Sequence, residues 1–249
     1  MKRAGRIRVA VVVAGLSLLE LACRIGLIRP ITLTPPSQMA LMLVELLGSG
    51  QLTTDALKTL SNVLAASLSA VACGFILGAL LHAWPRARRA IDPFLASYYA
   101  VPVFVFYPVL IALFGMRDLP IVAIGFLSAV VAMLINTLNG LDRIPPALLK
   151  TARIFQMGPV STALRIKLPS AVPHVLTGVK LAVAYSFIGV IAAEFILSGS
   201  GLGYAISFAY NNFETRKMYA LMLFILVLVS SVNAGFHAWE RILLRRRGR

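Results

Sequence analysis

The amino-acid sequence predicts an all-α membrane protein with about six transmembrane helices. Hydrophobic residues make up 59% of the 249-residue chain and charged residues only 13%, which is about half the charged share of an ordinary soluble domain. Apolar runs long enough to cross a hydrocarbon core of about 30 Å recur along the chain. Short basic clusters separate these runs, which is how membrane topology is encoded. The net charge of +15 therefore indicates membrane orientation, and we expect no nucleic-acid partner.

The apolar runs divide the chain into six expected spans. We place these spans at residues 9–28, 57–83, 91–114, 119–141, 173–198 and 218–240. The corresponding organisation is an N-terminal transmembrane helix (1–28), a periplasmic loop (29–56), a transmembrane domain (57–241) and a basic cytoplasmic tail (242–249). We expect the first span to remain uncleaved, because Glu20 stands where a lipoprotein cleavage site before Cys23 needs an aliphatic residue.

The distribution of lysines and arginines predicts which ends of the spans face the cytoplasm. With a cytoplasmic N-terminus, 17 of these residues fall on inside loops and tails, and five (Arg29, Lys58, Arg117, Arg216 and Lys217) fall outside. Cytoplasmic segments carry the basic excess in multi-pass membrane proteins. We therefore expect both termini in the cytoplasm, together with the segment between the fourth and fifth spans.

The second expected span carries a small residue at every fourth position, namely Ala66, Ala70, Gly74 and Gly78. Residues four apart lie on the same face of a helix, so these form a smooth ridge. A neighbouring helix can approach such a ridge closely, as is usual for helix pairs in membranes. We interpret the ridge as a packing surface.

The third expected span is interrupted by Pro102 and Pro108, with Phe104 and Phe106 between them. Each proline removes a helical hydrogen bond and kinks the chain. Inside a bilayer, the freed carbonyl groups must be buried in protein or face a water-filled cavity. Both a structural kink and a role in lining a translocation path fit this pattern, so Pro102, Phe104 and Phe106 are candidate path residues.

Two polar side chains inside expected spans are the other candidates for a path or gate. Asn136 lies at the inner end of the fourth span, where such a residue more often bridges helices than binds a solute. Glu194 lies late in the fifth span, near the outer face. An acid at that depth is costly and should have a partner. Gating and a structural hydrogen bond to a loop both fit Glu194, and we favour the structural bond.

The sequence contains no pattern typical of a catalytic, metal or nucleotide site. Cys23 and Cys73 lie in apolar runs, and the histidines are scattered singly. The glycines of GSGLGY (199–204) lack dinucleotide-loop spacing, and no G-x-x-x-x-G-K-[ST] loop is present. We interpret these glycines as a turn at the outer membrane surface, and we expect this chain to be neither an enzyme nor a binder of cofactors.

A basic segment at 147–174, rich in proline, separates the fourth and fifth spans. Pro145-Pro146 can begin a short amphipathic helix. Leu148, Ala152 and Phe155 are expected on one face of this helix, and Met157-Gly158-Pro159 is expected to break it. A second short helix should end at Leu168-Pro169, with Pro173 beginning the next span. From the residues alone, the product is either a loop resting on anionic lipid or a handle for a soluble partner.

This segment resembles the coupling motif of ABC importer permeases, whose pattern is E-A-A, three residues, G, nine residues, I-x-L-P. The positions here that match the motif are Lys150, Thr151, Ala152, Gln156, Ile166, Leu168 and Pro169. The resemblance covers nearly the whole chain and is to the nitrate, sulfonate and taurine permease group. Its other elements are TLTPPSQ (32–38), Phe114-Gly115, NTLNGL (136–141), Ala193-Glu194 and GLGY (201–204).

The segment departs from the resembled motif at two positions. Lys150 replaces a glutamate and Gln156 replaces a glycine, for which Gly158 is expected to take over the bend. No acid lies between Asp142 and Glu194, so Lys150 cannot form an ion pair within the segment. We hypothesise that the partner supplies an extra acidic residue opposite it.

The resemblance implies a type I ABC importer transmembrane-domain fold with a cytoplasmic coupling helix-turn-helix. It implies a permease subunit in a bacterial inner membrane, working with a cytoplasmic ATPase dimer that binds ATP and Mg²⁺. A periplasmic or lipid-anchored solute-binding protein, a second permease copy and membrane lipid are the other implied partners. The implied solute is small, for example an anion such as a sulfonate, taurine or nitrate.

Three alternatives to a homodimeric permease differ in what they require. In a heteromeric assembly, this chain would pair with a second, different permease. A secondary transporter would need internal repeats and coupling-ion ligands in unwound mid-membrane segments, and neither feature is evident. A membrane-embedded enzyme would need clustered catalytic or metal-binding residues, and no such cluster stands out in the sequence.

Overall fold

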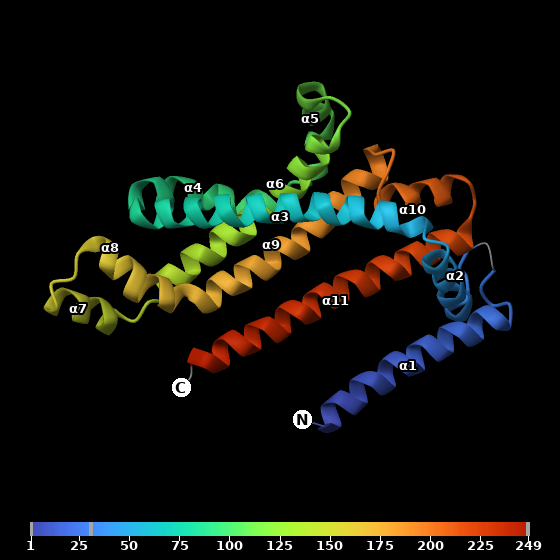
Figure 1. Ribbon diagram of the computed structural model, residues 1–249, viewed down its shortest axis with the longest axis horizontal. Coiled ribbons are helices and arrows are strands. Elements are labelled where there is room, and N and C mark those ends of the chain that lie inside the picture. The colour runs from blue at the N-terminus through green and yellow to red at the C-terminus, as the bar shows by residue number, and fades with distance from the viewer. Residues whose placement is uncertain (1, 30–31, 248–249) are drawn as a thin grey trace. The chain divides into compact units, whose positions relative to one another are not determined.

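The computed structural model describes residues 2–29 and 32–247, and every regular element in those ranges is helical (Figure 1). The α-helices are α1 (Lys2–Arg24), α2 (Pro36–Gly48), α3 (Gln51–Ala83), α4 (Pro85–Ser97), α5 (Tyr107–Phe114), α6 (Asp118–Asp142), α7 (Pro146–Ile154), α8 (Pro159–Thr162), α9 (Leu168–Leu197), α10 (Leu202–Asn211) and α11 (Thr215–Arg247). The expected all-α fold class is confirmed.

Four helical runs in the described ranges are long and apolar enough to cross a membrane. They are Gln51–Ala83, Asp118–Asp142, Pro159–Ile196 and Thr215–Ile242. The pair Pro85–Ala100 and Val103–Phe114 makes a fifth if it is counted as one broken span. The expected first span forms α1, but this helix carries Arg6, Arg8, Glu20 and Arg24 and is not among the four. A membrane-spanning role for α1, which would bring the number of spans to six, therefore stays a prediction. The bounds of the four expected parts of the chain also stay predictions.

The third expected span, 91–114, is not one kinked helix. Its two halves meet at an angle of 94°, with short 3₁₀ turns at η1 (Tyr98–Ala100) and η2 (Val103–Phe106) between them. Val101 is extended, with a ψ of 118°, because the ring of Pro102 excludes the helical conformation from the residue before it. Pro102 also has no N–H to continue a helix. The basic cluster at 84–89, expected as a loop, instead begins α4.

The two segments expected to lie outside the membrane as loops each contain a helix. Residues 29–56 include α2 and the start of α3, and residues 199–217 include α10. Residues 30 and 31 lie outside the described ranges. A carboxylate from another helix accepts hydrogen bonds at the N-terminus of α2. The Glu20 carboxylate accepts from the backbone N–H of Ser37 at 3.0 Å and from its hydroxyl at 2.6 Å, which satisfies a donor that α2 itself cannot pair.

The chain folds as two compact units. The first comprises residues up to Lys58 together with Glu194–Leu228, and the second comprises Thr59–Ala193 together with the chain from Val229. The core of the first unit is built from α2, α3, α10 and α11, through Leu46, Leu52, Ile206, Ala209, Ala220 and Leu221. The core of the second unit is built from α3, α6 and α9, through Ala70, Ala129, Val130, Val131, Met133 and Ala182.

The small-residue ridge of α3 packs closely against α6 in the second unit, so the expected packing surface is confirmed. A Cβ atom added to Gly74 would lie 2.6 Å from the carbonyl oxygen of Val130, and one added to Gly78 would lie 2.8 Å from Cβ of Thr137. Ala66 and Ala70 are fully buried. Backbones that approach this closely leave no room for side chains, which explains the spacing in the sequence.

Candidate functional site

The segment between α6 and α9 begins with a short helix at Pro146, as the sequence predicts. It then runs into α9 without the expected break. Helix α7 starts at Pro146 and ends at Ile154. Helix α8, the π-helical turn η3 (Ala163–Lys167) and α9 then form one helical run, Pro159–Ile196, of 38 residues. The expectation that Leu168-Pro169 ends a second short helix and that Pro173 begins a new span is therefore wrong. We call residues 146–167 the coupling segment.

Two prolines, Pro169 and Pro173, lie in this helical run without ending it. Neither Pro169 nor Pro173 can donate a backbone hydrogen bond to the preceding turn. The π turn directly before Pro169 changes the register, as such turns do within α-helices. The hydroxyl of Ser170 donates to the carbonyl oxygen of Ile166 at 2.7 Å, and that of Thr177 donates to the carbonyl oxygen of Pro173 at 3.0 Å. The coupling segment is thus continuous with a long helix.

The turn after α7 is a Schellman motif centred on Gln156. The backbone N–H of Met157 donates to Ala152 O at 2.9 Å, and that of Gln156 donates to Arg153 O at 3.0 Å. This arrangement needs a left-handed residue, usually glycine, and Gln156 supplies it with a φ of 49°. Gly158 has a φ of −63°, so the expectation that it takes over the bend is wrong.

Ala152 lies inside the coupling segment and is only 3% exposed. It lines a cavity of about 300 Å³ between the two arms, together with Leu149, Met157, Pro159 and Thr162. Ala152 was expected on one face of the helix with Leu148 and Phe155, but the second arm covers Ala152 and leaves the other two exposed. A charge placed at Ala152 would disturb the fold of the segment itself.

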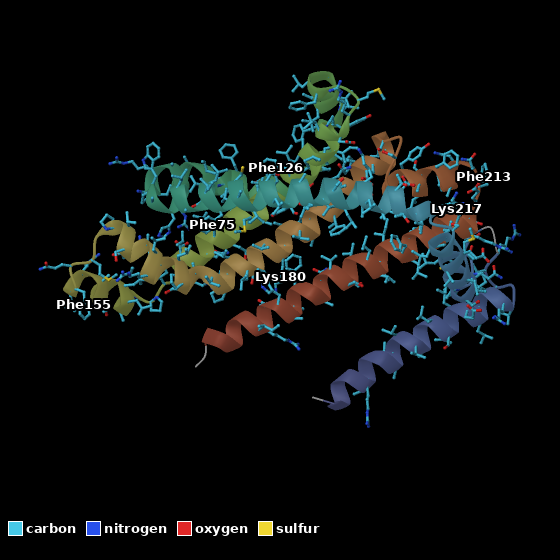
Figure 2. All side chains as sticks on the ribbon, viewed as in Figure 1. Phe75, Phe126, Phe155, Lys180, Phe213 and Lys217 are labelled. Atoms are coloured by element: carbon cyan, nitrogen blue, oxygen red, sulfur yellow. The ribbon has the colours of Figure 1, made fainter. Side chains whose placement is uncertain are left out.

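Three apolar side chains project from the coupling segment instead. Ile154 is 79% exposed, Phe155 74% and Val160 70%, and Figure 2 shows Phe155 at the tip of the segment. Of these three residues, only Phe155 was singled out in the sequence, on one face of the first short helix. The signal that could have found all three is their position on either side of the Met157-Gly158-Pro159 turn.

The polar motif residues surround this apolar tip. Lys150, Thr151, Gln156 and Gly158 are exposed, whereas Ile166 is half-buried. Thr151 donates its hydroxyl hydrogen to the carbonyl oxygen of Ala147 at 3.0 Å. Among the described residues, Lys150 forms no ion pair. Leu168 and Pro169 form the first turn of α9.

An ion cluster missed by the sequence analysis lies at the base of the coupling segment. Asp142, the last residue of α6, accepts two hydrogen bonds from the guanidinium of Arg88, at 2.7 and 2.6 Å. His82 Nδ1, at the end of α3, lies 3.2 Å from the same carboxylate. A bidentate arginine pair fixes orientation as well as distance. Together, Asp142, Arg88 and His82 join the end of α6, the start of α4 and the end of α3. This cluster lies where the chain enters the coupling segment.

A cavity of about 160 Å³ lies beside the break in the third span, within the second unit. Its walls come from the broken segment and from α6 and α9. The side chains with polar or aromatic groups are those of Tyr98, Tyr99, Phe104, Ser128 and Tyr185. Val101 and Val103, on either side of Pro102, complete the wall at the break. The three tyrosines were missed, although a Tyr-Tyr pair just before a proline in an apolar run was a visible signal.

The structure brings only part of the predicted path residues together. Phe104 lines the cavity, next to the backbone around Pro102. Phe106 is half-exposed and lies outside its lining. Asn136 donates to its own helix, to the carbonyl oxygen of Ala132 at 2.8 Å. It lies where Gly178 of α9 allows close approach, with an added Cβ 2.9 Å from its own.

Glu194 belongs to the first unit and is fully buried. Its carboxylate accepts a hydrogen bond from the backbone N–H of Gly203 at 3.2 Å, at the start of α10. The backbone N–H of Gly201 donates to the Asp55 carboxylate at 2.8 Å. The structural hydrogen bond to a loop that we favoured is present, and a gating role for Glu194 stays a prediction.

Comparison with known proteins identifies the family. The model of the family described as "Binding-protein-dependent transport system inner membrane component" matches residues 70–249. The chain belongs to this family. It is an ABC importer permease, a multi-pass membrane subunit of a system whose ATPase is a separate chain.

The permease has relatives of similar length at low identity. It is 28% identical to the nitrate import permease NrtB of Leptolyngbya laminosa over 72% of this chain and 65% of that protein. It is 26% identical to the putative aliphatic sulfonates transport permease SsuC of Bacillus subtilis, over 90% of this chain and 81% of the relative. It is 23% identical to the taurine transport permease TauC of Escherichia coli, over 87% and 81%.

Solved structures with the same fold include inward-facing forms of the MetNI methionine ABC transporter. One superposes with a TM-score of 0.66 at 15% identity, over 74% of this chain and 92% of that one. A second inward-facing form superposes with a TM-score of 0.65 at 17% identity, over 77% of this chain and 95% of that one. The expected type I importer fold is therefore confirmed.

Proposed function

We propose that the coupling segment of this permease docks on a cytoplasmic ATPase dimer and transmits its closure to the spans. ATP and Mg²⁺ would bind to that partner, and this chain would neither hydrolyse ATP nor hold a cofactor. A periplasmic or lipid-anchored binding protein delivers a small solute to the outer side. Small anions such as a sulfonate, taurine or nitrate are the solutes that the names of the relatives suggest.

The exposed apolar tip of the coupling segment carries this proposal. Ile154, Phe155 and Val160 lie together in sequence around a rigid turn, with Lys150 and Arg153 exposed beside them. Solvated loops rarely present such clustered apolar surface without a partner. A groove with an apolar floor and an acidic rim would cover the tip and meet the cations. The competing occupant is an anionic lipid surface, which favours the same composition.

The continuity of the helical run supports a mechanism. Because Pro159–Ile196 is one run, a displacement of the coupling segment displaces α9 directly. The bidentate pair of Asp142 and Arg88 ties α4 to the end of α6, just before the coupling segment begins. An ATPase that closes on ATP would in this way bias a two-state bundle between inward-facing and outward-facing forms.

The assembly and orientation follow from the same proposal. Both termini lie in the cytoplasm of a bacterial cell, the permease sits in its inner membrane, and a second copy completes the pathway. A heteromeric pair is the alternative to the homodimer, and neighbouring genes that encode one permease or two would discriminate between them.

In a chain with Cys23 and Cys73 replaced by serine, an impermeant thiol reagent should label Ala40→Cys and Phe213→Cys in intact cells. Labelling of Val160→Cys would refute this orientation.

A matched pair of variants tests the docking. Phe155→Asp places a charge on the apolar tip, and burying an unpaired charge is costly. We expect it to reduce recovery of the ATPase with the purified permease by at least about tenfold, because that loss corresponds to only about 1.4 kcal/mol. Trp84→Asp changes a side chain that is also exposed, at 67%, but lies outside the segment, and it should leave recovery unchanged. Full recovery with Phe155→Asp, together with lost binding to anionic nanodiscs, would assign the tip to lipid.

A further inference from the structure

We propose that the cavity beside the break in the third span binds a planar, uncharged ring, as the whole solute or as one end of it. This inference rests on the proposed transport function, and it narrows the class of solute that can pass. The proposed solute differs from the small anions named for the relatives. The cavity is lined by aromatic side chains, which suit a ring, and by no charged side chain that could pair with an anion.

The tyrosines of the cavity form a rigid aromatic platform. The rings of Tyr99 and Tyr185 are stacked, with centroids 5.4 Å apart and planes 27° apart. The ring of Tyr98 meets Tyr99 edge-on, at 5.8 Å and 86°. Tyr98 is held in place because its hydroxyl donates to the carbonyl oxygen of Leu127 at 2.8 Å. Offset-stacked and edge-to-face geometries are the ones that aromatic rings prefer, so a further ring can extend the platform.

The size of the cavity fits a single ring. Its volume is about 160 Å³, and an apolar cavity of about 150 Å³ is known to hold benzene. Ile124 and Phe104 provide apolar walls around the platform. The cavity is open on one side, where Val101 and Phe104 in its wall are each 48% exposed, so its volume limits the part of a solute that it holds and not the whole solute.

Hydrogen-bonding groups in the cavity remain available for a ligand. Within the described part of the chain, the hydroxyls of Tyr99 and Tyr185 make no hydrogen bond. The hydroxyl of Ser128 donates to the carbonyl oxygen of Ile124 at 2.8 Å and keeps its lone pairs. These groups suit the ring nitrogens, carbonyls or amides of a polar planar molecule.

The charge of the cavity excludes a small anion as its preferred ligand. None of the residues that line it is a lysine, arginine, histidine, aspartate or glutamate. An anion entering it would lose hydration without gaining a counter-charge, which is costly. A cation would gain attraction from the ring faces but would also enter without an opposite charge, in a chain of net charge +15.

The break in the helix forms part of the wall of this cavity. Residues 98–106 are not α-helical, and Val101 and Pro102 have extended ψ values of 118° and 109°. Non-helical backbone at membrane depth is tolerated only where it is buried in protein or lines a water-filled cavity. The lining of this cavity includes Val101, so the break and the ring site belong to one feature.

The experiment measures binding of benzamide to the full-length permease in nanodiscs by saturation-transfer NMR. Cyclohexanecarboxamide is the matched ligand, because it has the same amide and a puckered, non-aromatic ring. Methanesulfonate, taurine and benzamidinium are the charged competitors, as an anion, a zwitterion and a cation. We expect a saturable benzamide signal at least about fivefold above that of cyclohexanecarboxamide, unaffected by an excess of methanesulfonate or taurine. An energy difference of about 1 kcal/mol, typical for aromatic pairs, corresponds to that factor.

Variants locate the signal. Tyr99→Ala should abolish the benzamide signal, Tyr99→Phe should retain most of it, and Tyr210→Ala should leave it unchanged, since Tyr210 lies outside the cavity. Equal signals from the two amides, stronger binding of benzamidinium, competition by methanesulfonate or taurine, or indifference to Tyr99→Ala would each overturn the proposal. No ATPase is present, so a failure here is separate from a failure of ATPase docking by the coupling segment.

Discussion

Gly201 and Gln156 both hold a left-handed backbone, with φ values of 99° and 49°, and each adjoins a short helix. At Gly201 the space around the residue is full, because an added Cβ would lie 2.6 Å from the carboxyl carbon of Glu194. At Gln156 the side chain is exposed, and only the backbone conformation opposes it. The turn at Gly201 is therefore restricted to glycine by the neighbouring Glu194 side chain. The turn at Gln156 accepts a larger residue, at the cost of backbone strain.

This difference shows what each turn has to do. The loop at Gly201 places buried polar groups of the first unit, so an error there disturbs the hydrogen bond between Glu194 and Gly203. The turn at Gln156 is exposed and shapes the surface that the ATPase would cover under the proposed function. A left-handed residue other than glycine costs about 1–2 kcal/mol, and such strain persists only where the surroundings compensate. The following predictions test the comparison, beginning with the largest effect.

Gly201→Ala should destabilise the permease strongly, by about 3 kcal/mol, because it combines a left-handed backbone with a clash against a buried carboxylate. The melting temperature in detergent measures this effect. Gly199→Ala is the control, since an added Cβ there meets no atom within 4 Å and its φ is not positive. A similar melting temperature for both variants would show that Glu194 moves freely and does not fix the turn.

Glu194→Ala should destabilise by about 1–3 kcal/mol, because the buried N–H of Gly203 loses its acceptor. Glu194→Gln keeps an oxygen that accepts this hydrogen bond and should recover most of the stability. Transport by the Gln variant then separates the two interpretations of Glu194. Retained transport indicates a structural residue, whereas normal stability with lost transport indicates that the negative charge acts as a gate.

Gln156→Gly should raise stability by up to about 1 kcal/mol, since glycine adopts the left-handed conformation without the steric cost of a side chain. Gln156→Ala removes the side chain but keeps the strain, so it should not raise stability. Thermal unfolding of the purified permease distinguishes the two. If Gln156→Ala raised stability as much as Gln156→Gly, the destabilisation would come from the glutamine side chain. The left-handed backbone at residue 156 would then not be strained.

Lys150→Glu should change stability least, because Lys150 is exposed and surface charges contribute little. Its effect should appear in coupling, as weaker stimulation of the cognate ATPase in nanodiscs and stronger stimulation of an ATPase from a permease that has glutamate here. Charge pairs at a partly desolvated interface contribute more than exposed pairs. Unchanged cognate stimulation would show that no acidic residue of the ATPase faces Lys150.

Sequence patterns predicted the features that depend on spacing along one helix. The four-residue ridge of α3 and the start of α7 at Pro146 were visible because helical periodicity and proline chemistry act locally. The burial cost of an acid in a span predicted that Glu194 would have a partner. The same local rules misjudged Pro169 and Pro173, because the helical run continues through both prolines, with a π turn just before Pro169.

Features that join distant residues could not be predicted in this way. Arg88 and Asp142 are 54 positions apart, and nothing in either local sequence indicates the other. Ala152 was misplaced because the periodicity of a nine-residue helix gives its faces but not which face the second arm covers. The ring cavity needs three chain segments to converge, so its tyrosines stayed unnoticed in apolar runs.

Under the proposed function, the helical run from Pro159 to Ile196 would act as a single rod. At 1.5 Å per residue, its 38 residues extend about 57 Å, and the rod carries Tyr185 of the ring cavity well along its length. A rod that turns at one end turns at the other, so rotation driven from the cytoplasm would alter the angle between Tyr185 and Tyr99. The reverse also holds, because a ring held against Tyr185 resists that rotation. Occupancy and ATP turnover would then be linked through torsion of one helix, without a separate relay.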